Sequence, residues 1–179
     1  MAGLTSTFAA RWRRAALGEP GVFAEVAADS AALSQAAIVV IAGGLARGVE
    51  RFAEAGWFGV AGNAAVGIVF WFVASVLVWR IGALARPPGA DFPALLRAVG
   101  FSAAPLAALA ICAALSGRSA LFASLAIHSW AAVVFASAVK SALGAPLLRS
   151  LVVAGSALLA TIALLVLAAG VLIRMALLD

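Results

Sequence analysis

Residues 151–173 read LVVAGSALLATIALLVLAAGVLI and contain no charged side chain. An apolar run of about 20 residues is long enough to cross the hydrocarbon core of a bilayer as a helix. Four more apolar runs precede it, at residues 31–45, 57–79, 98–115 and 120–139, and a basic residue follows closely after each. The sequence therefore predicts an all-α, polytopic membrane protein with five transmembrane helices and an N-terminal amphipathic segment.

The composition supports this class. Hydrophobic residues make up 66% of the 179 residues and charged residues 11%, whereas a soluble domain is about half apolar and about a quarter charged. A soluble globular enzyme, a disordered chain and a coiled coil are thereby excluded. The single cysteine, Cys112, excludes a disulfide framework and a thiolate metal cluster. The basic residues form no stripe that follows phosphates, so no nucleic-acid partner is expected.

Residues 1–30 are predicted as a cytoplasmic amphipathic segment, and residues 31–179 as the five-helix transmembrane domain. Apolar residues recur at helical spacing in the first part of this segment: Leu4, Phe8, Trp12 and Ala15. A short helix is therefore expected to lie in the headgroup region, and a second to begin near Pro20. The residues expected at the membrane surface are Trp12, Arg11, Arg13 and Arg14. Charged residues follow this basic cluster where a signal peptide needs an apolar region, so no signal peptide is expected.

Basic residues are unevenly distributed among the connections between spans. The N-terminal segment and the loops after the second and fourth spans carry eight of them, and the connections on the other side carry four. The positive-inside rule then predicts a cytoplasmic N-terminus and a periplasmic C-terminus. Arginine is used in place of lysine almost throughout and alanine is abundant, which is typical of a GC-rich bacterial genome. The expected location is therefore a bacterial inner membrane.

The loop between the second and third spans has two parts. Arg86 and the run Pro87-Pro88-Gly89 come first, and proline restricts the residue before it, so an extended or turned backbone is expected. Residues 92–97 then form an amphipathic stretch that is expected to lie along the membrane.

His128 is the one histidine of the chain and lies near the middle of the predicted fourth span. One hypothesis makes it an axial ligand of haem or of a chlorophyll-type pigment, with Trp130 beside the macrocycle, or a titratable switch. Another makes it an interhelical hydrogen-bonding residue, with Asn63 or a serine as its partner. His128 is thus a candidate cofactor-binding residue. Ser156 follows Gly155, but no oxyanion hole stands out beside it, which favours close packing over serine catalysis.

Small residues at helical spacing are the stronger signal, because they let helix backbones approach closely in lipid. They serve either to pack this bundle or to form a subunit interface. Pro105 is expected to kink the third span. The predicted helix-packing or interface positions are Gly44, Gly48, Gly59, Gly62, Asn63, Gly67, Gly100, Phe101 and Pro105.

Two stretches on either side of the loop before the third span share a pattern. Residues 70–82 contain FWF and WRIG, and residues 91–105 contain DF followed by LLRAVGFSAAP, with a Gly-aromatic-x-x-x-Pro element at Gly100-Phe101 and Pro105. Together with Pro20-Gly21-Val22-Phe23, these stretches resemble the Yip family, five-span membrane proteins named for interaction with Ypt/Rab GTPases. The resemblance implies five helices, a cytoplasmic N-terminus and no catalytic residues.

The leading functional hypothesis is a non-enzymatic integral membrane scaffold that acts through helix and lipid contacts and needs no cofactor. Its expected partners are the lipid bilayer and other integral membrane proteins or a second copy of the chain. One alternative is an accessory transmembrane subunit of a pigment- or haem-bearing photosynthetic or respiratory complex. Another is a small-solute transporter that depends on Asn63 or Gln35. His128 is the only acid or base inside the predicted spans, which disfavours proton-coupled transport.

Overall fold

The structure is a computed structural model that describes residues 7–84 and 91–176. Within these residues the chain is helical and contains no strand. Five helices are long and apolar enough to cross a membrane: Ala32–Glu50, Phe52–Leu84, Phe92–Cys112, Gly117–Leu143 and Leu147–Met175. The predicted all-α class with five spans is confirmed, and five such apolar helices indicate an integral membrane protein. Leu4, Arg86 and the Pro87-Pro88-Gly89 run lie outside the described residues.

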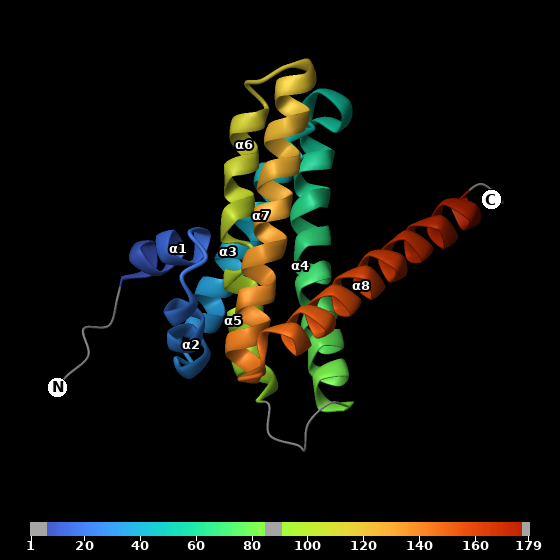
Figure 1. The fold of residues 1–179 in the computed structure, drawn as a ribbon. Helices are drawn as coiled ribbons and strands as arrows, with labels where there is room; N and C mark the ends of the chain where they lie inside the picture. The colour runs from blue at the N-terminus through green and yellow to red at the C-terminus, as the bar shows by residue number, and fades with distance from the viewer. Residues whose placement is uncertain (1–6, 85–90, 177–179) are drawn as a thin grey trace.

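Two short helices precede the first span and lie on one side of the bundle (Figure 1). The first, α1 (Phe8–Ala16), begins after Thr7, whose hydroxyl accepts a hydrogen bond from a backbone N–H of the first turn. Gly18 follows with φ +73°, a conformation that glycine adopts without steric cost. The second, α2 (Pro20–Ala28), starts with a proline because the first turn needs no N–H from that residue.

These two helices share a hydrophobic core with the bundle. Phe23 of α2 and Phe101 of the third span are fully buried in it, together with Val134 of the fourth span. Full burial of one such side chain contributes about 1.5–3 kcal/mol relative to an exposed one. Residues 8–28 are therefore packed on the transmembrane helices and do not form a separate body.

The first two spans are longer than predicted. The first, α3 (Ala32–Glu50), runs past the expected end at Leu45, so that Arg47 lies inside a helix. The second, α4 (Phe52–Leu84), is interrupted at Gly56, which has φ +56° and ψ −156°. Glycine is the residue that tolerates this backbone conformation, so the regular helix of the second span starts next to the predicted first residue, Trp57.

The third span is broken into three pieces: α5 (Phe92–Phe101), the 3₁₀ helix η1 (Ala104–Ala108) and α6 (Leu109–Cys112). Pro105 lies at the start of η1, and its ring and missing N–H prevent a regular α-helix there. The predicted kink is thus present as a 3₁₀ segment. Residues 92–97 differ from the expectation of a stretch that precedes the third span, since they form the first turns of α5 within the helix Phe92–Cys112. Leu95 and Arg97 are buried among neighbouring helices.

The last two spans are α7 (Gly117–Leu143) and α8 (Leu147–Ala176), and Gly144 turns the chain between them with φ +54°. The first half of α8 packs on α4 and α7, where Val153 and Ala157 are buried. Beyond Thr161 its described side chains are exposed or half-buried. Figure 1 shows this half of α8 leaving the bundle at an angle.

Candidate functional site

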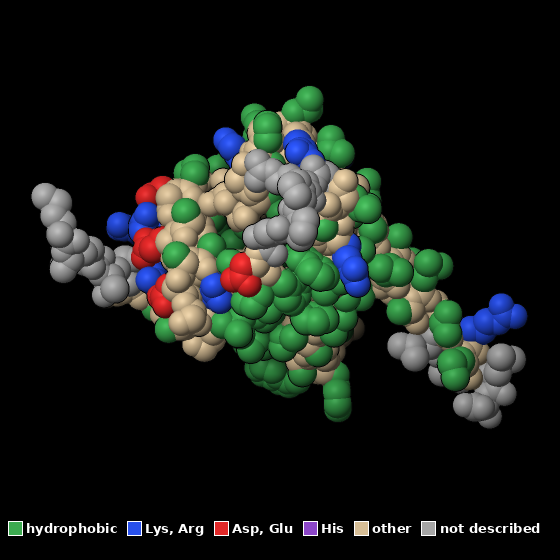
Figure 2. Space-filling view, turned by 90° about the horizontal axis from the view of Figure 1, so that it is seen from below, with side chains coloured by type: hydrophobic (Ala, Val, Ile, Leu, Met, Phe, Trp, Pro, Cys, Tyr) green, Lys and Arg blue, Asp and Glu red, His purple; other side chains and the backbone are tan. Residues whose placement is uncertain are grey.

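Charged side chains gather on one flank of the molecule, where Figure 2 shows red and blue groups side by side. Arg11 of α1 donates hydrogen bonds to Glu25, at 2.8 Å, and to Asp29, at 2.6 Å. Arg14 donates to both oxygens of Glu19, at 3.0 Å each from Nε, and to Oε2 of Glu25, at 2.6 Å. We define these five residues as the N-terminal ionic cluster: Arg11, Arg14, Glu19, Glu25 and Asp29.

Arg11 is buried, with 4% of its surface exposed, and its Nη1 also donates to Gln35 of α3 at 3.2 Å. Burial lowers the pKa of Arg11, but its hydrogen bonds to Glu25 and Asp29 outweigh burial and raise the pKa overall. The hydrogen bond from Arg11 lowers the pKa of Asp29, and the N–H of Ala31 lowers it further. Both side chains therefore stay charged at neutral pH, and Arg11 ties α1, α2 and α3 together.

A second buried arginine holds the end of α2. Arg97 of α5 is 8% exposed, and its Nε donates to the carbonyl of Val26 at 3.2 Å while Nη2 donates to that of Ala27. The last carbonyls of a helix have no partners inside the helix and carry partial negative charge. Arg97 satisfies two of them. The sequence alone does not indicate this contact, because there Arg97 contributes only to the charge asymmetry of the connections.

The residues predicted at the membrane surface occupy different environments. Arg11 is buried in the N-terminal ionic cluster, where it is held by Glu25 of α2 and by Asp29 at the C-terminal end of α2. Arg14 is partly buried and ion-paired. Arg13 is exposed, and none of the hydrogen bonds or ion pairs between described residues involves its side chain. Trp12 is half-buried and packs edge-to-face on Phe8, with ring centroids 5.5 Å apart.

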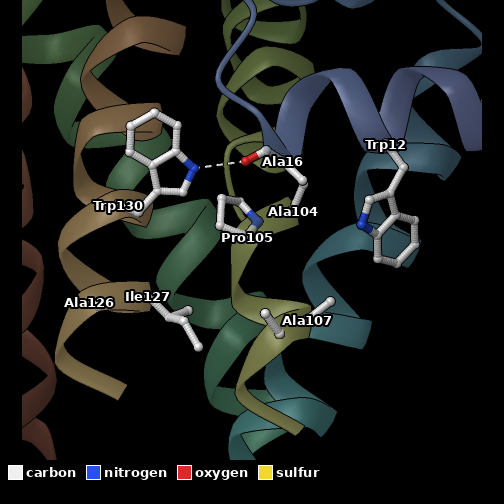
Figure 3. A pocket seen from close by; sticks show the side chains of 9 residues that line it. Trp12, Ala16, Ala104, Pro105, Ala107, Ala126, Ile127 and Trp130 are labelled. Carbon is white, nitrogen blue, oxygen red and sulfur yellow. Dashed lines mark hydrogen bonds between the residues drawn. The ribbon is translucent and has the colours of Figure 1, made fainter. Parts of the chain in front are cut away.

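An open apolar groove lies between α1, η1 and α7 and has a volume of about 480 Å³. Figure 3 shows Trp12 and Trp130 on its two sides. Five alanines, Pro105 and Ile127 line the space between them. The indole Nε1 of Trp130 donates to the carbonyl of Ala16 at 2.8 Å, which ties α7 to the end of α1. The hollow exists because short alanine side chains occupy the positions that larger residues would fill.

His128 uses both ring nitrogens within the protein. Nε2 lies 3.0 Å from Nη1 of Arg47, and Nδ1 lies 2.8 Å from the carbonyl of Ser124. A guanidinium only donates hydrogen bonds, so Nε2 is the acceptor, and the carbonyl only accepts, so Nδ1 carries the proton. These contacts assign the neutral Nδ1–H tautomer. A metal at Nε2 would have to displace Arg47. The apolar run that ends at Leu45 does not indicate this partner, because it predicts a helix that stops before Arg47.

Two of the predicted small residues bring α3 and α4 together. A Cβ added to Gly44 would lie 2.7 Å from the Cα of Ala64, and one added to Gly48 would lie 2.4 Å from the Cα of Val60. Gly67 lies opposite, since its Cβ would be 3.6 Å from the Cα of Gly44. The Gly44/Gly48 pair thus packs this bundle, because only hydrogen fits where the two backbones meet.

The neighbouring predicted positions differ in their surroundings. A Cβ on Gly62 would meet nothing within 4 Å, so this glycine makes no close helix contact. A Cβ on Gly59 would meet Ala55 of its own helix, beside the break in α4. The amide of Asn63 donates to the carbonyl of Gly59 at 2.8 Å and is thereby satisfied locally.

Several polar side chains of the spans bond to their own helix. The hydroxyls of Ser75, Ser156 and Thr161 donate to carbonyls one turn earlier, at 2.7–2.8 Å. Such bonds satisfy a hydroxyl in lipid without a partner on another helix. Within the described parts of the chain, no three His, Cys, Asp or Glu residues gather where they could hold a metal ion.

Three residues of the stretches that carry the family resemblance meet at the junction of α3, α4 and α5: Trp71, Leu96 and Gly100. The Nε1 of Trp71 donates to the carbonyl of Leu96 at 2.8 Å. A Cβ on Gly100 would lie 2.7 Å from the Cβ of Ala36 and 3.0 Å from the Trp71 ring, and Phe101 beside it is fully buried. Comparison with protein-family models, curated proteins and solved structures finds no match to this chain. The resemblance therefore rests on the sequence pattern of residues 20–23, 70–82 and 91–105 alone.

Proposed function

We propose that the protein is a non-enzymatic integral membrane scaffold that acts through contacts of its helices with other membrane proteins. The observation that carries this proposal is the outer part of α8, residues 162–175, which we define as the distal α8 segment. Its apolar side chains Leu164, Leu167 and Val171 are exposed, and the segment projects from the bundle (Figure 1). A second transmembrane helix can therefore lie along it without displacing any contact of this protein.

The chemistry of the distal α8 segment supports a helix as the partner. It contains the small residues Ala168, Ala169 and Gly170, and a Cβ on Gly170 would meet nothing within 4 Å. Small residues allow close backbone approach, which is the main source of helix association in lipid. The non-enzymatic part of the proposal is supported by Ser75, Ser156 and Thr161, whose hydroxyls are engaged in hydrogen bonds within their own helices.

The same proposal has three further parts: the protein is related to the Yip family, it lies in a bacterial inner membrane, and its N-terminal face is cytoplasmic. The kinship is supported by the packing of Trp71, Gly100 and Phe101 in one junction, since residues of a family motif are expected to serve one structural purpose. The location is supported by the charge asymmetry of the connections. In this arrangement α1, α2 and the N-terminal ionic cluster form the cytoplasmic face of the scaffold.

The test is site-specific photo-crosslinking in native membranes. A photoreactive amino acid at Leu167, in the distal α8 segment, is compared with one at Val69, an exposed apolar position of α4. The scaffold proposal expects a protein adduct of defined mass at position 167 that is absent at position 69. Lipid adducts alone at both positions, together with a monomeric mass for the purified chain, would overturn the proposal.

A further inference from the structure

We propose that the groove between α1, η1 and α7 binds one acyl chain of an anionic glycerophospholipid, with the lipid phosphate at Arg13. This binding site goes beyond the scaffold function and does not depend on it. The groove has a volume of about 480 Å³. An apolar cavity of about 150 Å³ holds one benzene molecule. The volume of the groove is about three times larger, which is enough for a hydrocarbon chain.

The polarity of the groove matches a lipid from end to end. Ala107 and Ile127 belong to helices long and apolar enough to span the membrane, and they form the apolar end. The other end lies beneath α1, where Figure 3 shows the indole nitrogen of Trp12 on the groove side of its ring. None of the hydrogen bonds between described residues uses this nitrogen. Tryptophan is enriched at headgroup level, where an ester or phosphate oxygen is available as acceptor.

The charges around α1 favour an anionic headgroup at this end. Arg11 and Arg14 are committed to carboxylates, whereas Arg13 is exposed without such a bond. The charge of Arg13 interacts with that of Glu19, but the carboxylate of Glu19 is hydrogen-bonded to Arg14. Arg13 follows Trp12 directly and precedes Ala16 by three residues, so it borders the side of α1 that faces the groove. A basic residue at a membrane surface attracts anionic lipid.

The experiment uses the full chain reconstituted into vesicles with equal amounts of phosphatidylglycerol and phosphatidylcholine. After extraction in mild detergent, native mass spectrometry measures the lipids that each chain retains. We expect one phosphatidylglycerol per chain in the wild type. Ala107→Phe fills the groove and should lower the lipid-bound fraction at least five-fold. Arg13→Gln should keep a lipid but lower the ratio of phosphatidylglycerol to phosphatidylcholine about five-fold.

Two variants serve as matched controls. Ala110→Phe adds the same side chain at an exposed position of α6 outside the groove, and Arg118→Gln removes an exposed arginine at the start of α7. Both should retain lipid as the wild type does. If Ala107→Phe fails to show a cooperative unfolding transition, Ala126→Phe on the opposite wall replaces it, since Ala126 is exposed and accepts a larger side chain.

Three results would overturn the lipid site. Equal lipid retention by the groove variants and Ala110→Phe would indicate adventitious annular lipid only. A wild type that retains no lipid would show that the groove has no affinity for an acyl chain. A polypeptide adduct that is lost on filling the groove would show that a protein segment, and not a lipid, is the occupant.

Discussion

Arg11 illustrates how a charged residue is accommodated next to a membrane bundle. Removing a guanidinium from water is unfavourable unless hydrogen bonds and opposite charges replace the water. Glu25 and Asp29 supply both, and Gln35 satisfies a further donor. The side chains of the two carboxylates remain 30% and 32% exposed, so they keep part of their hydration. The arrangement favours docking of α1 and α2 over their release into solvent.

Arg11→Ala is expected to destabilise the folded protein by about 1–3 kcal/mol. Removing one partner of a buried ion pair costs about 3–5 kcal/mol when the other stays desolvated, and the partial exposure of Glu25 and Asp29 reduces this. The free energy of unfolding in detergent measures the effect. Arg13→Ala, at an exposed position without an ion pair, should change it by less than about 0.5 kcal/mol. Equal effects of the two substitutions would contradict the role assigned to Arg11.

The stability of the N-terminal face should fall in acid. The folded-state pKa of Asp29 lies below its unfolded value because Arg11 hydrogen-bonds its carboxylate, and Arg14 lowers the pKa of Glu19 in the same way. A group with a depressed pKa contributes stability at pH values above its unfolded pKa, which is about 3.9 for aspartate. This contribution is lost as the pH falls through the folded-state pKa. The thermal midpoint should therefore drop below about pH 4.

Asp29→Asn should remove part of this acid dependence while it lowers the midpoint at neutral pH. Thermal unfolding followed from neutral pH to below about pH 3.9 checks both effects. Glu54→Gln alters an exposed carboxylate that pairs with Arg51, away from the N-terminal ionic cluster, and should keep the wild-type profile. An unchanged slope in Asp29→Asn would show that another group controls the acid transition.

At the scale of elements, the contact between α3 and α4 is set by the absence of side chains. Gly44 and Gly48 lie against backbone atoms of α4, so the distance between the helices depends on hydrogen at both positions. Gly62 is also a glycine of α4 but lies in open space. The sequence spacing predicts the same packing role for all three glycines, whereas in the structure only Gly44 and Gly48 have it.

Gly48→Ala and Gly62→Ala should therefore have opposite effects on stability. In Gly48→Ala the new methyl would meet the Cα of Val60, which moves only if α3 and α4 separate, and overpacking of this kind costs about 1–3 kcal/mol. In Gly62→Ala nothing opposes the methyl, and replacing a helical glycine gains about 0.5–1 kcal/mol. The free energies of unfolding of the two variants test this prediction. Destabilisation by both substitutions would contradict the conclusion that Gly48 is closely packed and Gly62 is not.

The whole molecule combines a compact core near α1, α2 and α5 with one helix that diverges. The 30 residues of α8 extend about 45 Å, which exceeds the hydrocarbon thickness of about 30 Å. An apolar helix of this length fits the bilayer when it is inclined. The inclination in Figure 1 is thus compatible with its length, and it exposes the distal α8 segment.

The charge asymmetry of the connections predicts that the N-terminus lies in the cytoplasm and that the turn between the third and fourth spans lies on the opposite side of the membrane. In a background where Cys112 is replaced by alanine, Thr7→Cys should react with a membrane-impermeant thiol reagent only after the membrane is permeabilised. Ser119→Cys, which is exposed at the start of α7, should react in intact cells. Reaction of both in intact cells, or of Ser119→Cys only after permeabilisation, would contradict a cytoplasmic N-terminus.

Hydropathy and residue spacing were enough to predict the helical class, the five spans and the break at Pro105, because a chain in lipid must satisfy its backbone polar groups locally. Runs of apolar residues then leave little choice but helices. The same patterns located each span to within several residues, and they missed the continuation of α3 through Arg47. Four features follow from the packing of the helices instead: Arg11 is buried, Arg47 contacts His128, Gly48 packs closely whereas Gly62 does not, and alanines leave a groove beneath α1. These features depend on which residues distant in sequence meet, and hydropathy and spacing do not encode such contacts.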